Sequence, residues 1–106
     1  MYYIEKEVSL QNGLQLKNLG LHIITQLRLD RINKEVEVQI CSYESRKDWA
    51  EGIVGAINSF LLKFDVDPYV SDVEALAWNV LLGVENGIFS KAELQQCDTA
   101  EFYKEA

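Results

Sequence analysis

The side chains best suited to chemistry in this chain are one imidazole and two thiols. His22 is the only histidine, and Cys41 and Cys97 are the only cysteines. Nucleophilic catalysis needs a base beside the nucleophile, and neither Gly20 nor Ile24, which flank His22 on its strand face, helps it act. Zinc would need further ligands at short spacing, which neither thiol has. We therefore expect no catalytic residue, no metal and no cofactor, and we interpret these groups as a surface histidine, a strand thiol and a helix thiol.

Paired carboxylates are the other feature that could do chemistry. Their members stand two residues apart, so that both leave the same face of a strand. The pairs are Glu5 and Glu7, Glu35 and Glu37, and Asp65 and Asp67. Two such groups could raise one pKa and act as acid and base, but the solvated face of an amphipathic sheet has the same appearance. The run Asp65-Val66-Asp67 departs from a calcium loop at Pro68-Tyr69, and the six glycines form no phosphate-binding pattern. We expect no enzyme and no small-molecule substrate.

The composition is that of a folded, acidic protein. The 106 residues are 48% hydrophobic and 25% charged, with 17 acidic and 10 basic residues and a net charge of −7. This length suits one domain over residues 1–106, and the charge repels phosphate backbones, so no nucleic-acid partner is expected. Residues 1–7 lack the basic start and apolar core of a signal peptide. No apolar stretch reaches membrane-spanning length, so no membrane partner is expected either.

Two alternating runs define the largest element that must position these side chains. Leu19–Asp30 and Glu35–Glu44 alternate apolar and polar residues, which predicts a long antiparallel hairpin with a loop over 31–34. The predicted register pairs Leu29 with Val36, Leu27 with Val38, Thr25 with Ile40 and Arg28 with Glu37. It places Leu27 on the buried face and His22 on the outer face, opposite Tyr43.

Shorter runs flank this hairpin. Residues 2–10 alternate as a first strand, and Asn12-Gly13 predicts a tight turn with two positive φ angles. The apolar set then changes from even to odd numbers near Leu19, which predicts a bulge or corner at 17–20. Residues 45–55 are expected to form a loop with a helical turn. The run 57–66 predicts a further strand, which Pro68 ends; its apolar face consists of Phe60, Leu62, Phe64 and Val66.

Two capping boxes predict two helices. Ser71-Asp72-Val73-Glu74 begins a packing helix over 71–85, and Asn86-Gly87 ends it. The stripe that packs on the sheet consists of Val73, Leu76, Ala77, Val80, Leu81 and Val84. Ser90-Lys91-Ala92-Glu93 begins a shorter helix, followed by a fraying tail. The expected fold is α+β: an antiparallel sheet of about four strands in residues 1–67, the packing helix on one face, and the short helix and tail in 90–106.

The packing helix carries a second apolar face. Ala75, Trp78 and Leu82 lie together, roughly opposite the sheet-packing stripe, and a helix with two apolar faces is usually covered on both. In one interpretation these residues, joined by Trp49 from the long loop, form a protein interface, since tryptophan is enriched at binding hot spots. In the other, Phe89 and Leu94 of the same chain cover Trp78.

The order of these parts resembles a group of small structural proteins of tailed bacteriophages. The resemblance covers roughly residues 2–82; its stretches are 3–8, 11–14, the end of the hairpin at 43–45, the loop to Gly52, and the phenylalanine-rich strand through Asp67 into a helix. It implies a non-enzymatic virion component of a tail, neck or capsid, present in many copies and in contact with other virion proteins or with copies of itself. The Ser90 helix departs from the group. The alternative function is a small, acidic, cytoplasmic regulator or inhibitor that binds a single host or phage protein.

Overall fold

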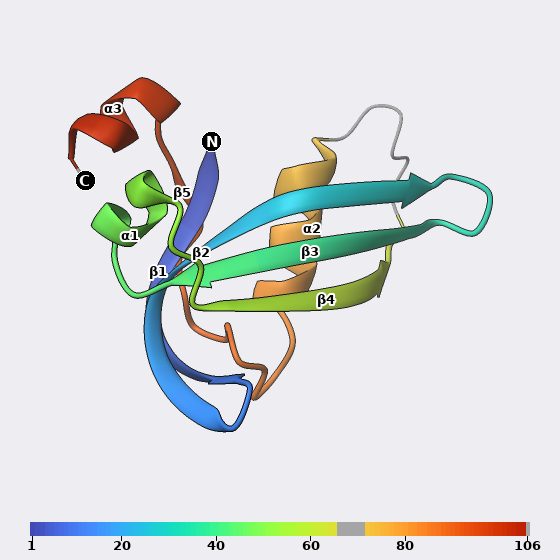
Figure 1. Cartoon of the computed structure of the whole chain (residues 1–106). Coiled ribbons are helices and arrows are strands. Elements are labelled where there is room, and N and C mark those ends of the chain that lie inside the picture. Colours follow the sequence, from blue (N-terminus) through green and yellow to red (C-terminus); the bar gives the residue numbers. More distant parts are fainter. Residues whose placement is uncertain (66–71, 106) are drawn as a thin grey trace.

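The computed structural model describes residues 1–65 and 72–105 of the chain, which form an α+β fold. A five-stranded antiparallel sheet has the order β4-β3-β2-β1-β5. The strands are β1 (Tyr2–Asn12), β2 (Gln15–Asp30), β3 (Glu35–Tyr43), β4 (Ala56–Lys63) and β5 (Gln95–Gln96). The helices are α1 (Arg46–Glu51), α2 (Val73–Leu82) and α3 (Thr99–Lys104). Figure 1 shows α2 behind the sheet. It also shows α1 and α3 together beyond the C-terminal end of β3.

The central hairpin of β2 and β3 confirms the predicted loop and the register near it. Leu29 lies opposite Val36, Leu27 opposite Val38, and Arg28 opposite Glu37. The carboxylate of Asp30 holds the loop, because its Oδ1 accepts from the backbone N–H groups of Ile32 and Asn33 at 3.0 and 3.1 Å. An aspartate that binds the backbone two residues on is a common way to begin a turn.

The register changes farther along this hairpin, where the prediction was wrong. One extra β2 residue, Thr25, stands between the pairs formed by Ile24 and Gln26, so Ile24 and not Thr25 lies opposite Ile40. Such a bulge reverses the faces of all residues that precede it. His22 therefore lies opposite Ser42 and not Tyr43.

The bulge or corner predicted at 17–20 is found at the last of these residues, Gly20, which stands against two residues of β1. Residues 17–19 of β2 pair regularly with β1, and the extra residue belongs to β1, between Glu5 and Val8. Both strands bend sharply here (Figure 1). The turn that joins them has Gly13 and Leu14 at its centre, and only Gly13, with φ 62°, has the left-handed conformation. Glycine first of two central residues is one of the favoured hairpin turns, so Asn12 ends the strand instead of sharing the turn.

The first two helices differ in how well they match the prediction. α1 is the predicted helical turn, with Ser45 as its cap and Gly52, at φ 74°, as its end. α2 begins later than predicted, because Asp72 is the cap and accepts from the backbone N–H of Ala75 at 3.2 Å. The proposed cap Ser71, the strand end at Val66, and Asp67 and Pro68 lie outside the described residues. α2 ends at Gly83, so Val84 is exposed instead of packed.

The C-terminal part of the chain was predicted wrongly. Residues 88–91 form turns instead of a helix, with Lys91 at φ 67°, and the two residues of β5 pair with Tyr2 and Tyr3. The expected frayed tail contains α3, capped by Asp98. Its Phe102 is fully buried. One buried aromatic in six helical residues gives too weak a periodicity to predict a helix.

Two hydrophobic clusters lie on opposite faces of β3. Even-numbered residues such as Val36, Val38 and Ile40 face α2 and belong to the α2 cluster, together with Trp78 and Phe89. Odd-numbered residues of β3 face the other way, and Cys41 and Tyr43 among them belong to the α3 cluster. This cluster consists of Tyr3, Leu21, Ile23, Cys41, Tyr43 and Phe102, with Met1, Trp49 and Cys97 packed against it. Leu27 lies opposite the fully buried Val38 but is 37% exposed. The face of β2 that was predicted to be buried is therefore already exposed at Leu27, before the hairpin loop is reached.

Candidate functional site

The structure pairs His22 with Ser42, an arrangement that the sequence did not indicate. The Nδ1 atom of His22 lies 2.6 Å from Ser42 Oγ, and its Nε2 atom lies 2.8 Å from the backbone oxygen of Lys6. A carbonyl oxygen can only accept, so Nε2 carries the proton and Nδ1 accepts from the Ser42 hydroxyl. The prediction that His22 lies on the outer face was wrong because the Thr25 bulge turns it toward the α2 cluster.

A serine beside an imidazole can be a nucleophile with its base, but this pair is enclosed. Both side chains are 0% exposed, and the Phe89 ring lies edge-on to the imidazole at 5.0 Å. Burial lowers the pKa of His22, so the ring is neutral and fully hydrogen-bonded. A substrate has no access to Ser42 Oγ in this arrangement, and the pair is best understood as a satisfied polar core.

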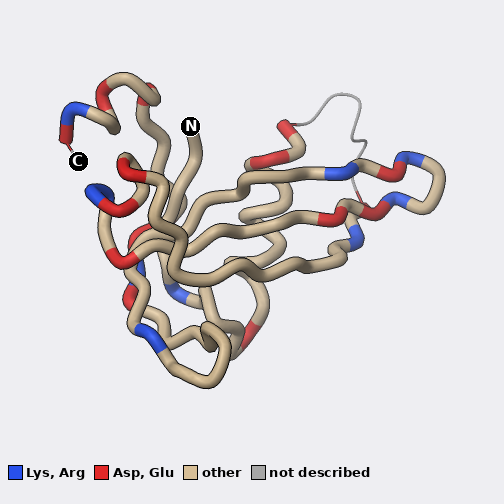
Figure 2. Tube along the Cα trace, in the orientation of Figure 1, with Lys and Arg blue, Asp and Glu red and all other residues tan. Residues whose placement is uncertain are grey.

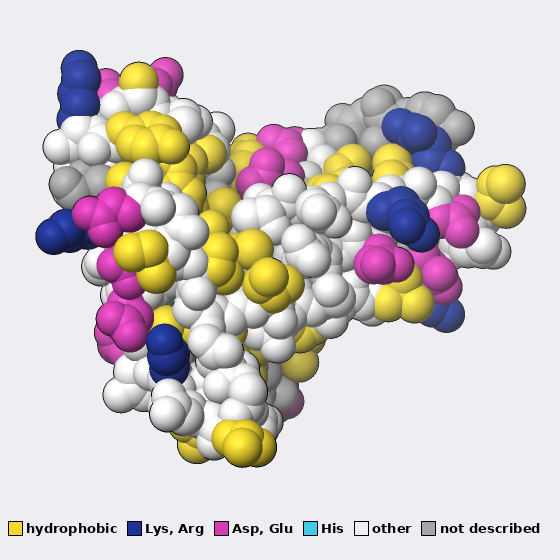
Figure 3. Space-filling view, in the orientation of Figure 1, with side chains coloured by type: hydrophobic (Ala, Val, Ile, Leu, Met, Phe, Trp, Pro, Cys, Tyr) yellow, Lys and Arg dark blue, Asp and Glu magenta, His cyan; other side chains and the backbone are white. Residues whose placement is uncertain are grey.

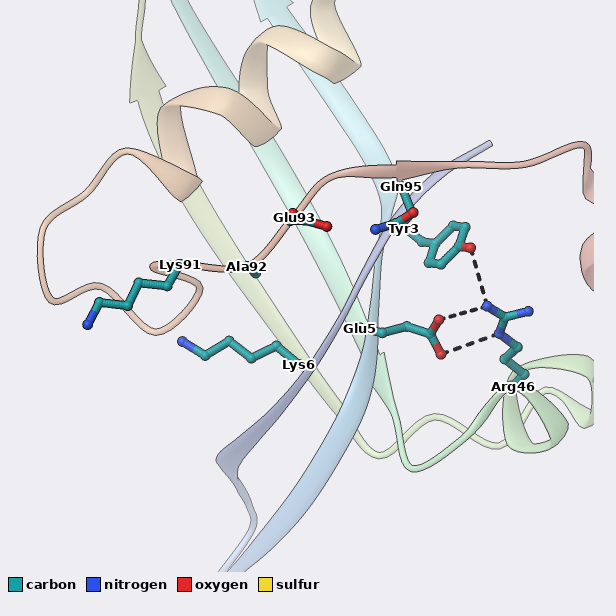
Figure 4. A pocket seen from close by; sticks show the side chains of 8 residues that line it. All are labelled: Tyr3, Glu5, Lys6, Arg46, Lys91, Ala92, Glu93 and Gln95. Carbon is teal, nitrogen blue, oxygen red and sulfur yellow. Dashed lines mark hydrogen bonds and ion pairs between the residues drawn. The ribbon is translucent and has the colours of Figure 1, made fainter.

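Arg46 is a charged side chain with several partners at the surface. Its Nη2 and Nε atoms bind the two carboxylate oxygens of Glu5 at 2.7 and 3.3 Å, and Nη2 donates to the Tyr3 hydroxyl at 3.2 Å (Figure 4). Nη1 binds Glu105, and the guanidinium lies 4.6 Å from the centre of the Phe102 ring. The Glu5 hydrogen bonds raise the pKa of Arg46. Arg46 thus ties α1 to β1 and to α3.

A surface recess of about 560 Å³ lies beside this cluster. Its lining consists of Tyr3, Glu5, Lys6, Arg46, Lys91, Ala92, Glu93 and Gln95 (Figure 4). Its charges are largely engaged, because Arg46 holds Glu5 and Lys6 Nζ donates to the backbone oxygen of Ser90 at 2.6 Å. These contacts connect α1 to β1, and β1 to the segment after α2.

The predicted carboxylate pairs are split between different partners. Glu5 binds Arg46, Glu35 lies 3.8 Å from Lys63, and Glu37 lies opposite Arg28. In residues 1–65 and 72–105 no group of three or more histidine, cysteine or acidic side chains could hold a metal ion. Cys41 is buried and Cys97 partly buried, and both are free thiols.

The four predicted interface residues do not form one surface. Trp78 is 0% exposed, with its ring edge-on to Phe89 at 5.6 Å, so the chain itself covers it. This is the alternative in which Phe89 covers Trp78, although Phe89 sits in a turn and not before a helix. Trp49 packs against Phe102 at 4.7 Å in the α3 cluster, on the far side of the sheet from α2. Ala75 and Leu82 are partly buried, and Leu82 packs on the α2 cluster.

Exposed apolar side chains instead gather along β4 and the segment before it. Ile53, Val54, Ile57 and Leu61 are 53%, 39%, 57% and 64% exposed. Figure 3 shows exposed hydrophobic side chains on the sheet face that α2 leaves uncovered. Lys63 is the only charged residue in 53–63, and Figure 2 shows charges concentrated at the hairpin tip and around α1 and α3 instead. The alternation in the sequence indicated that this strand has an outer face, but not that the strand lies at the edge of the sheet.

The backbone of β4 is open along its outer side. β4 is the last strand of the sheet, and no described strand pairs with its outer side. The backbone N–H of Phe64 donates to the backbone oxygen of Lys34, the residue before β3, at 3.1 Å. The direction of the backbone N–H and C=O groups alternates along an antiparallel strand. The backbone groups of even-numbered β4 residues therefore point toward β3, and those of odd-numbered residues point outward. We call the outward-facing residues Ile57, Ser59, Leu61 and Lys63 the β4 edge.

None of the described helices is long and apolar enough to cross a membrane.

Comparison with known proteins adds no relative. The chain matches no protein-family model, no curated protein and no solved structure.

Proposed function

We propose that this chain is a non-enzymatic protein that works through protein–protein contacts as a repeated part of a larger assembly. The observation that carries the proposal is the β4 edge, where unpaired backbone groups and two exposed apolar side chains, Ile57 and Leu61, coincide. An open strand edge is a template for pairing with another chain.

The β4 edge lacks the devices that usually protect such a strand. Natural proteins blunt their edges with charges, proline, bulges or very short strands. β4 is eight residues long, pairs with β3 without a register shift, and contains no proline. Its single charge, Lys63, lies at its end. An edge with these properties is suited to a partner strand.

The kind of assembly is proposed from the sequence. The resemblance in residues 2–82 favours a bacteriophage virion, with the chain in a tail, neck or capsid-associated position after assembly in the host cytoplasm. Its partners would be copies of itself or other virion proteins, and no nucleic acid, membrane, cofactor or small-molecule substrate is required. The net charge of −7 also suits the second candidate, a small cytoplasmic regulator that binds one host or phage protein.

Mass spectrometry of purified particles tests the proposal. The particles would come from the phage that encodes the chain, with its known capsid protein as the internal standard and a host cytoplasmic protein as the contamination control. A virion component appears in a fixed ratio to the capsid protein through successive purification steps. A chain that is lost with the contaminating host protein contradicts the virion proposal and leaves the regulator as the candidate.

A further inference from the structure

We infer that the β4 edge pairs antiparallel with the β4 edge of a second copy, with a two-fold axis at Ser59. The two sheets then form one continuous sheet across both copies. This inference rests on the proposed function, because it names the partner of the strand edge described above. It accounts for an edge that is long, apolar and otherwise open.

The backbone sets which registers are allowed. The outward-facing residues have odd numbers, so hydrogen-bonded pairs between two copies must join odd residues with odd residues. Centring on Ser59 sets Ser59 opposite Ser59 of the second copy. It also sets Ile57 opposite Leu61 of that copy, and Leu61 opposite Ile57.

The side chains favour this register over those in which the axis is shifted toward the end of β4. Both exposed apolar residues of the edge then face each other, and aromatic or β-branched apolar cross-strand pairs stabilise a sheet. Lys63 falls opposite Gly55 of the second copy, so no like charges meet. Shifting the axis to residue 60 would instead place each Ile57 against Lys63, and shifting it to Leu61 would place each Ile57 against Asp65.

The other sheet face also gains from this pairing. Phe60, which is only partly buried on the edge of the α2 cluster, falls opposite Asn58 of the second copy. The neighbouring copy thus extends the cover of that ring. A two-fold contact of this kind uses the same patch twice and closes on itself, which yields a dimer and not a fibre.

A charge exchange tests both the contact and its register. Ile57→Glu and Leu61→Lys are made singly and together, and mass is measured by light scattering, with circular dichroism to verify folding. The wild type is expected at twice the 12.1 kDa mass of one chain, and each single variant at the mass of one chain, because a charge then faces an apolar side chain. In the double variant the carboxylate introduced at position 57 faces the ammonium group introduced at position 61 of the other copy. This happens twice across the two-fold axis, so the dimer mass is expected to return.

Cross-linking provides a second measurement. In a Cys97→Ser background, Ser59→Cys is expected to form a disulfide between copies under mild oxidation. Directly opposite residues in a hydrogen-bonded pair have Cα atoms about 5.5 Å apart, within the range of a disulfide. Gln39→Cys is the matched control, because Gln39 lies opposite Ser59 on β3 and its copies would be about 14 Å apart, three strand spacings.

The outcomes separate this inference from the proposed function. A folded wild-type chain that stays monomeric overturns the inference, and so does a dimer that survives either single substitution or that the double variant does not restore. Equal cross-linking at positions 39 and 59 also overturns it. If the chain is present in particles but fails these tests, the proposed function stands without this contact. If the dimer forms as described but the chain is absent from particles, the contact stands and the virion proposal fails.

Discussion

At the scale of single residues, two polar side chains each hold distant segments together through several hydrogen bonds. His22 joins β2 to Ser42 of β3 and to the backbone of Lys6 in the β1 bulge. Arg46 joins α1 to Glu5 and Glu105. Both work because their groups have fixed directions: the imidazole has one donor and one acceptor, and the guanidinium has a planar fork.

The burial of His22 makes the stability of the protein depend on pH. Its pKa is lowered in the folded chain, so the unfolded chain takes up the proton first as pH falls. The stabilising contribution is complete above the unfolded pKa of about 6.5 and is lost as pH falls toward the folded pKa, at no more than about 1.4 kcal/mol per pH unit. Urea unfolding between pH 7.5 and 5.5 should therefore give a falling free energy of unfolding.

The variant His22→Gln is the control for this pH dependence. Glutamine can donate and accept but does not titrate, so its free energy of unfolding should vary less over the same range. The chain has no other histidine. Burial raises the pKa of Glu74, and its contribution has the opposite sign, being lost as pH rises, but it is the same in both proteins. Equal slopes for the two proteins would contradict a buried neutral imidazole.

Replacing Arg46 by lysine should destabilise the protein although the charge is kept. Lysine cannot bind both oxygens of Glu5 or lie flat against the Phe102 ring. We expect Arg46→Lys to lower the free energy of unfolding by about 1–3 kcal/mol, and Lys47→Ala, an exposed control in the same helix, to change it by less than about 0.5 kcal/mol. A variant as stable as the wild type would show that charge alone accounts for the contribution of Arg46.

At the scale of elements, the shortest ones depend most on tertiary contacts. α1 and α3 have six residues each, and helices of this length are not stable alone in water. They are held against each other and the sheet by aromatic contacts. The centre of the Trp49 ring lies 4.7 Å from that of Phe102 and 4.3 Å from that of Tyr103. The pairing of β5 with β1 brings the chain to this place.

Phe102 should therefore determine whether α3 stays attached. Phe102 is 0% exposed, and Phe102→Ala should lower the free energy of unfolding by about 3–5 kcal/mol, the usual cost for a buried phenylalanine. Lys104→Ala, on the exposed side of the same helix, should change it by less than about 0.5 kcal/mol. Equal effects of the two substitutions in urea unfolding would mean that α3 does not pack as described.

At the scale of the whole molecule, two hydrophobic clusters share the same strands. β1, β2 and β3 contribute side chains to both the α2 cluster and the α3 cluster. The clusters therefore cannot be lost independently without breaking strand pairs common to both. Each contains one of the two tryptophans, Trp78 in the first and Trp49 in the second.

The two tryptophans allow each cluster to be followed separately. In Trp49→Phe the remaining Trp78 should be shielded from iodide quenching, whereas in Trp78→Phe the partly exposed Trp49 should be quenched more. In each variant, fluorescence and far-ultraviolet circular dichroism should give the same urea midpoint, because unfolding is expected to be cooperative. Different midpoints for the two signals would show that the clusters unfold separately.

The sequence by itself determined the α+β class, the antiparallel β2–β3 hairpin and its register next to the loop. Period-two alternation decides these features, since a one-residue slip would bring polar residues to the buried face. It also indicated the inner face of α2, where Ala77 and Leu81 are buried, through helical spacing. These are local consequences of which side chains avoid water.

Only the tertiary structure decided the features on which the site depends. The Thr25 bulge could not be predicted from the sequence, because threonine suits either face of a strand. It nevertheless turns His22 inward, toward Ser42. The cover of Trp78 by Phe89, the attachment of α3 through Phe102 and the open side of β4 are likewise contacts, or missing contacts, between segments distant along the chain. Alternation shows that a strand has a buried face, but which strand is left at the rim follows from how all the strands pair.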